Sequence, residues 1–127
     1  MTRAADQRGV LVVEDDASIR HLVKMILERE GYAVEMAADG AEAMRKLGSA
    51  PYDVIVLDLM MPNLDGFAFM NAIAEQDPQR LKNVIVTSAA STTVIRDRMR
   101  GVPFDILPKP FDIRQLAERV RSCIAAQ

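Results

Sequence analysis

Side chains that could perform chemistry stand at or just beyond the ends of four short apolar runs in this sequence. They are Glu14, Asp15 and Asp16 after residues 10–13, Asp58 after residues 54–57, Thr87 after residues 84–86, and Lys109 after residues 104–107. Crowded carboxylates repel one another unless a cation neutralises them, and oxygen ligands of this kind select Mg²⁺ or a similar ion. A metal bound by carboxylates, an aspartate nucleophile, and a lysine and a threonine that bind negative oxygens are the components of phosphoryl transfer.

Each of these residues also has an ordinary structural explanation. Asp16 could cap the following helix, Asp58 could belong to a turn, Thr87 could simply end a strand, and Lys109 could be a solvated lysine. Such explanations are reasonable for one position but poor for four strand ends at once. We therefore favour a shared site.

The elements that must position these residues follow from the hydrophobic pattern. The runs 10–13, 54–57 and 84–86 are continuously apolar, which is typical of strands covered by helices on both faces of a parallel sheet. Weaker strands are predicted at 33–36 and 104–107, and helices at 19–27 with a stop at Gly31, 41–47 with a stop at Gly48, 67–75, 92–100, and after an Asp112 cap with Gln115 at the capping-box position. This alternation indicates an α/β fold, in which ligands bind beyond the carboxyl ends of the strands.

Composition narrows the class of protein. The length of 127 residues fits one domain, and a formal charge of −2 argues against a strongly basic nucleic-acid-binding domain. A single Cys and a single His provide neither an internal disulfide nor a tetrahedral zinc site. The first residues lack the apolar stretch of a signal peptide, and no apolar run is long enough to span a membrane. We expect one cytoplasmic domain over residues 1–127, with residues 1–8 as a disordered tail.

Four motifs occur in a characteristic order: VLVVEDD, VIVLDLMMPNLDG, VIVTSAA and LPKPF. With these motifs the sequence resembles the receiver domain of two-component response regulators from Gly9 to about Ala125. The resemblance implies a flavodoxin-like (βα)5 fold, a doubly wound parallel sheet of five strands in the order 2-1-3-4-5.

The resemblance also implies a role for each residue of the site. Asp58 would be the phosphoacceptor, and Mg²⁺, or Mn²⁺ in its place, would be bound by Asp15, Asp58, the backbone carbonyl of Met60 and, through a water, Glu14. Lys109 and Thr87 would bind phosphoryl oxygens, with Thr87 moving when phosphate arrives. The bond between Lys109 and Pro110 would be cis, which only an X-Pro bond adopts readily.

Two features depart from the family pattern or refine it. The family usually carries an aromatic switch residue three positions before the conserved lysine, and this chain has Ile106 there. Either an aliphatic side chain fills that space in both states, or Phe104 takes part of the role. Met60 and Ala89 lie where the family tunes the lifetime of the phosphoaspartate, and because neither can orient an attacking water, we expect slow self-dephosphorylation.

We therefore expect a phosphorylatable receiver in a two-component phosphorelay that catalyses only its own phosphorylation and dephosphorylation and is otherwise not an enzyme. The implied partners are a histidine kinase or a histidine phosphotransfer protein and an unidentified output protein, with no direct contact to nucleic acid or membrane. Output would pass through the face formed by the helix at 92–100, the strand at 104–107 and the final helix, which could also form a homodimer. This last third of the chain carries more basic than acidic side chains.

Alternatives remain open. One is a receiver-like scaffold that is never phosphorylated, against which the complete set of acids, Thr87 and Lys109 argues. Another is a phosphatase with an aspartyl nucleophile, which needs a second acid two residues after the nucleophile, where this chain has Met60. Because these residues show no output domain, the chain either works alone or belongs to a longer regulator.

Overall fold

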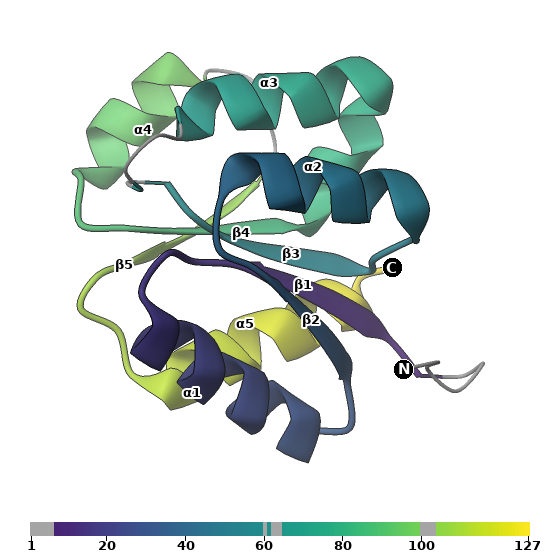
Figure 1. The fold of residues 1–127 in the computed structure, drawn as a ribbon. Coiled ribbons are helices and arrows are strands. Elements are labelled where there is room, and N and C mark those ends of the chain that lie inside the picture. Colours follow the sequence, from purple (N-terminus) through teal and green to yellow (C-terminus); the bar gives the residue numbers. More distant parts are fainter. Residues whose placement is uncertain (1–6, 60, 62–64, 100–103) are drawn as a thin grey trace.

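Parallel strands form the middle layer of the computed structural model, which describes residues 7–59, 61, 65–99 and 104–127 (Figure 1). Across these residues the sheet has five strands in the order β2-β1-β3-β4-β5, and every pairing is parallel. The strands are β1 Gly9–Val13, β2 Ala33–Ala37, β3 Val54–Asp58, β4 Val84–Ser88 and β5 Asp105–Pro108. The predicted fold class and strand order are therefore confirmed.

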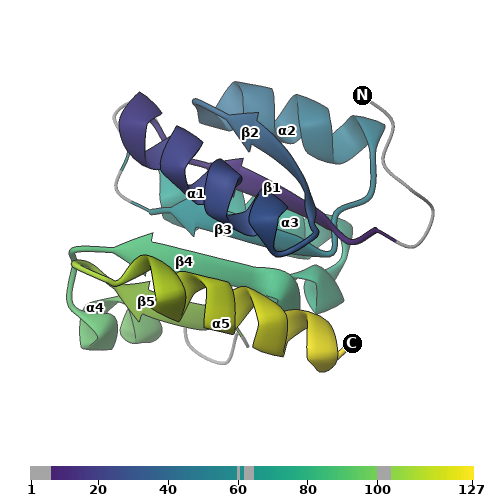
Figure 2. The ribbon, with the colours of Figure 1, turned by 90° about the horizontal axis from the view of Figure 1, so that it is seen from below.

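Helices cover both faces of this sheet. They are α1 Ala17–Arg29, α2 Gly40–Ser49, α3 Gly66–Gln76, α4 Thr92–Arg98 and α5 Ile113–Ala125, with a 3₁₀ helix, η1, at Pro78–Asn83. Helices α1 and α5 lie on one face, and α2, α3 and α4 lie on the other (Figures 1 and 2). Each face has its own hydrophobic cluster, which explains why β1, β3 and β4 are apolar without alternation.

Aspartates begin most of the helices. An Asp side chain accepts a backbone N–H bond at the start of α1, α2, α3, η1 and α5, from Asp16, Asp39, Asp65, Asp77 and Asp112 respectively. The predicted capping box of Asp112 and Gln115 is present. Helix α4 differs, because its cap residue Ser91 makes no side-chain bond.

Several local details differ from the sequence prediction. The helix η1 was not predicted, since its segment has no apolar periodicity and buries only Leu81. Gly48 lies inside α2 rather than ending it, whereas Gly31 follows α1 with a φ of 97° as expected. Residues 1–6 of the predicted tail lie outside the described residues, while the carbonyl of Arg8 accepts a bond from the Ala33 N–H at 2.9 Å.

The apolar side chains of α1, which recur at helical spacing from Ile19 to Leu27, are only partly buried. Val23 and Leu27 are buried, but Ile19 and Leu22 near the start of the helix are 37% and 45% exposed. Among the helices that the structure describes, none has the length and apolar character needed to cross a membrane.

Candidate functional site

The strand ends that carry the predicted site residues meet at one edge of the sheet. Asp58 ends β3, which lies between β1 and β4, and it pairs in register with Thr87 of β4. Glu14 follows β1 directly and continues its pairing, because its N–H bonds to the carbonyl of Ala37 at 3.1 Å. Lys109 follows β5, and its N–H bonds to the carbonyl of Ser88 at 2.8 Å. The parallel order thus brings four distant parts of the chain together.

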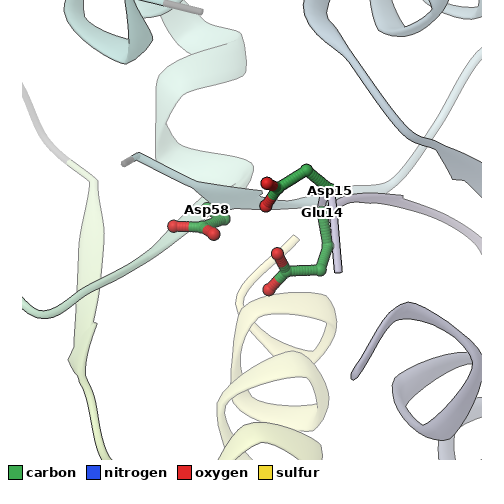
Figure 3. A group of neighbouring side chains, drawn as sticks. All are labelled: Glu14, Asp15 and Asp58. Atoms are coloured by element: carbon green, nitrogen blue, oxygen red, sulfur yellow. The ribbon is translucent and has the colours of Figure 1, made fainter. Parts of the chain in front are cut away.

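Three carboxylates form the centre of this site. One carboxylate oxygen from each of Glu14, Asp15 and Asp58 lies within 4.8 Å of the other two. Figure 3 shows the side chains of Glu14 and Asp15 reaching from the end of β1 toward Asp58 on β3. Glu14 and Asp58 are only 5% and 4% exposed, whereas Asp15 is exposed. The cluster is therefore buried on the side of the sheet and open to solvent at Asp15.

Lys109 brings a positive charge to this cluster. Its Nζ lies 3.2 Å from Oδ2 of Asp58 and 3.6 Å from Oε1 of Glu14. The single positive charge of the ammonium leaves an excess of negative charge when the carboxylates of Glu14, Asp15 and Asp58 are all ionised. A divalent cation would remove this excess, and the hard oxygen donors of the cluster fit Mg²⁺ or Mn²⁺.

The raised pKa of Glu14 shows the cost of burying it beside another carboxylate. Burial is the largest cause, and together with the neighbouring Asp58 it raises the pKa of this carboxyl from its ordinary value of 4.5 to about 7. The Asp16 N–H, which bonds to Oε2 of Glu14 at 3.2 Å, and the charge of Lys109 oppose the shift without cancelling it. Without a bound cation, Glu14 is therefore partly protonated near pH 7, and a metal ion that binds there would displace this proton.

A buried network supports the residues beside Asp58. The N–H of Leu59 bonds to the carbonyl of Thr87 at 3.0 Å, and Thr87 itself is 3% exposed. Gly66 packs so closely on Leu59 that a Cβ at position 66 would lie 2.7 Å from the Leu59 carbonyl oxygen. The Lys109–Pro110 peptide bond is cis.

The residues predicted to control switching occupy varied positions. Ile106 is 5% exposed and belongs to the hydrophobic cluster under α4, together with Phe104. Ala89 is exposed. Met60, with its predicted carbonyl ligand and its role in phosphate lifetime, lies outside the described residues.

Two arginines tie α4 to its neighbours. The guanidinium of Arg96 lies 5.0 Å from the ring centre of Phe104 and donates a bond to the Phe104 carbonyl at 3.0 Å. On the other side, the guanidinium of Arg98 lies 3.8 Å from the ring centre of Phe67 in α3. Contacts of this kind are attractive, and they connect α4 to β5 and to the helix that follows the Asp58 loop.

An apolar pocket of about 510 Å³ adjoins the site. Its lining combines the first half of α1, the residue after β4 and the chain from the end of β5 to the start of α5: Ile19, Leu22, Val23, Ala89, Lys109, Pro110, Phe111 and Ile113. This pocket explains the exposure of Ile19 and Leu22. The helical spacing of the apolar residues predicts that they share one face of α1. It does not show that other parts of the protein leave this part of the face uncovered.

A family model for the response regulator receiver domain matches residues 10–121. The chain belongs to this family. Among curated receiver proteins, the response regulator ArlR of Staphylococcus epidermidis is 31% identical over 122 residues, which cover 94% of this chain and 53% of ArlR. The chain thus spans about half the length of the curated relatives it matches.

Solved receiver structures agree with the fold. The Francisella response regulator 1452 receiver domain is 35% identical, with a TM-score of 0.81, over 94% of this chain and 98% of that one. The response regulator TrrA of Thermotoga maritima, solved in complex with Mg²⁺-BeF, is 29% identical, with a TM-score of 0.79, over 92% of this chain and 99% of TrrA. The receiver fold and its acidic pocket are therefore present in this chain.

Proposed function

We propose that this receiver domain accepts a phosphoryl group on Asp58 from a phosphohistidine, in a reaction that depends on Mg²⁺ or Mn²⁺. The observation that carries the proposal is the convergence of Glu14, Asp15 and Asp58 within 4.8 Å, with the Lys109 ammonium 3.2 Å from Asp58. Clustering two carboxylates that follow β1 with the carboxylate that ends β3 destabilises a fold unless a ligand compensates their charge.

The chemistry assigns each side chain a task. An Asp58 oxygen attacks phosphorus, a new O–P bond forms, and the P–N bond to the histidine imidazole breaks, leaving an acyl phosphate on Asp58. A bound divalent ion would supply the positive charge that offsets the phosphoryl oxygens. Lys109 neutralises part of the same charge, and the Thr87 hydroxyl donates a hydrogen bond to a phosphoryl oxygen. The domain catalyses only its own phosphorylation and dephosphorylation.

Output in this proposal passes through α4, β5 and α5. When Thr87 turns toward the phosphoryl group, the loop between β4 and α4 follows, and the contacts of Arg96 and Arg98 rearrange. Ile106 is already buried, so no aromatic rotation is needed at that position. The rearranged face would bind an output protein or a second copy of the domain.

The phosphoryl donor is a cytoplasmic histidine kinase or histidine phosphotransfer protein. It would dock at the apolar pocket formed by α1 and the residues after Lys109, because this pocket lies beside the lysine that contacts Asp58. Burying Ile19 and Leu22 there would supply binding free energy, while the neighbouring carboxylates receive the phosphoryl group.

Incubation with a small phosphodonor and Mg²⁺, followed by intact-protein mass spectrometry, tests the proposal. We expect one added phosphoryl group that is lost on base treatment and is absent from Asp58→Ala. Asp97→Ala, which removes an exposed carboxylate from α4, serves as the matched control and should be modified like the wild type. An unmodified wild type would favour the scaffold alternative, and a modified Asp58→Ala would place the phosphate elsewhere.

The lifetime of the phosphorylated state has a separate test. Because neither Met60 nor Ala89 offers a group that orients water, we propose slow decay of the acyl phosphate. Replacement Met60→Asn should accelerate the decay measured by mass spectrometry after the donor is removed. An unchanged decay rate would contradict this role of position 60.

A further inference from the structure

The loop that carries Glu14 and Asp15 is contacted by an arginine of α1. Nη1 of Arg20 donates to the backbone carbonyl of Glu14 at 2.8 Å and to that of Asp15 at 3.3 Å. A guanidinium Nη1 carries two hydrogens, so one nitrogen serves both carbonyls. Arg20 is also fixed at its own backbone, because its N–H bonds to the carbonyl of Asp16 at 2.9 Å. The side chain therefore returns from the first turns of α1 to the loop before it.

The other bonds of this loop hold mainly Glu14. Its N–H bonds to Ala37, and its Oε2 accepts from the N–H of Asp16 at 3.2 Å. Neither bond includes Asp15, whose exposed side chain must point toward Glu14 and Asp58 although like charges repel. Arg20 joins the carbonyls of both residues and thereby restrains the peptide unit from which the two carboxylates diverge.

We propose that Arg20 is a positioning residue that holds the carboxylates of Glu14 and Asp15 in the arrangement that binds the divalent cation. The inference rests on the proposed metal dependence of the site. Arg20 acts through the loop backbone and does not contact the metal or the phosphoryl group. Residues that orient metal ligands in this way typically change metal affinity by about 10-fold to 100-fold when they are replaced.

The direction in which Mg²⁺ affinity changes when Arg20 is replaced distinguishes a positioning role from a purely electrostatic one. A guanidinium near the site repels a divalent cation, so a purely electrostatic role predicts that removing Arg20 strengthens Mg²⁺ binding. A positioning role predicts the reverse, because the carboxylates then sample arrangements in which they do not share one ion. The two roles therefore predict opposite shifts in one measured quantity.

Mg²⁺ titration by isothermal calorimetry of the full chain provides this measurement. We expect Arg20→Met to weaken Mg²⁺ binding by about tenfold. Arg20→Lys keeps the charge but replaces the planar guanidinium with a flexible ammonium, so it should lie between Met and the wild type. Arg29→Met is the matched control, because it removes the same side chain from the last turn of the same helix and should bind Mg²⁺ within twofold of the wild type.

Amide hydrogen exchange shows whether the effect is local. In Arg20→Met we expect faster exchange at the N–H of Asp16, which bonds to Glu14, with unchanged protection in the buried part of α1 around Val23 and Leu27. Equal or tighter Mg²⁺ binding by Arg20→Met would overturn the inference, as would a loss of affinity accompanied by loss of protection throughout the chain. A wild type that binds no Mg²⁺ would instead refute the proposed function itself.

Discussion

The chain uses carboxylates in two opposite ways. At the helix starts, Asp16, Asp39, Asp65, Asp77 and Asp112 each accept backbone N–H bonds, with distances from 2.7 to 3.2 Å. At the carboxyl edge of the sheet, Glu14, Asp15 and Asp58 crowd within 4.8 Å of one another. A capping carboxylate faces N–H groups and the positive end of a helix dipole, whereas a clustered one faces other carboxylates. The same chemical group therefore stabilises the fold in one place and destabilises it in the other.

This difference separates residues that the fold needs from residues that the site needs. Replacement of a capping aspartate should lower stability and leave the chemistry intact, whereas neutralisation of a clustered acid should raise stability and remove the chemistry. A loss of stability in exchange for activity is common where a functional site holds groups that repel one another. Changes in the free energy of unfolding should therefore have opposite signs for the two groups of acids.

The largest effect is expected from the ionisation of Glu14. Because its pKa is about 7 in the folded state and ordinarily 4.5, the folded state binds a proton between these pH values that the unfolded state does not bind. The free energy of unfolding should therefore fall by about 3 kcal/mol from this group as the pH rises from 4.5 through 7. Glu14→Gln cannot ionise and should lose this slope, becoming more stable than the wild type at pH 8.

Urea unfolding followed by circular dichroism, in chelator and at a series of pH values, measures this effect. The contribution is read as the difference between the wild type and Glu14→Gln, since other groups titrate in both. Parallel pH profiles for the two proteins would show that Glu14 is not the source of the destabilisation.

Added metal should reverse the destabilisation. A cation that binds only the folded state, at ten times its Kd, adds about 1.4 kcal/mol to the free energy of unfolding. We expect this gain at pH 8 for the wild type and its loss in Asp15→Asn. Asp112→Asn also removes a carboxylate but from a helix cap, so it should gain as much as the wild type. An equal gain in Asp15→Asn would mean that the ion binds elsewhere.

Removal of a capping aspartate should act in the opposite direction. Asp112 accepts the N–H of Arg114 at 2.7 Å and forms the capping box of α5 with Gln115. We expect Asp112→Ala to lower the free energy of unfolding by about 1 kcal/mol at pH 7. Asp112→Asn retains a good cap and should cost much less. A stabilised Asp112→Ala would contradict the distinction between the two groups of acids.

The smallest effect is expected where the capping aspartate is missing. Ser91 makes no side-chain bond to α4, so Ser91→Asp would supply an acceptor for an N–H of the first turn. We expect a gain of about 0.5 kcal/mol, confined to α4 and visible as slower exchange of its amides rather than as a higher global stability. Unchanged exchange in α4 would show that this helix start cannot use a carboxylate.

Much of the fold follows from the sequence because the strands of a doubly covered sheet are continuously apolar. The strand predicted at 54–57 is observed as Val54–Asp58, and the helix after Asp112 begins where the capping box places it. Two stops were less predictable. Gly48 remains helical inside α2, and α4 ends at Arg98 with Met99 as its C-cap residue. Helix ends vary by one or two residues, so residue types alone place them poorly.

The site shows a similar division. Glu14, Asp15, Asp58 and Lys109 could be found because each lies at or just beyond the end of a strand, and parallel strand ends meet at one edge. Arg20 could not be found in this way, since its role lies in two backbone carbonyls that leave no pattern of residue types. The pocket beside α1 was also hidden, because periodicity identifies an apolar face without showing what covers it.

The absence of a side chain at Gly66 lets α3 pack closely against the residue after Asp58, and this packing limits which parts of the domain can move on phosphorylation. A Cβ there would lie 2.4 Å from Cδ1 of Leu59, so the start of α3 rests against the residue that follows Asp58. On its other side, Leu59 is bonded to Thr87 of β4. The residue next to Asp58 is thus held from two sides. We expect a new charge on Asp58 to displace the loop after β4 and to leave the backbone of β3 in place.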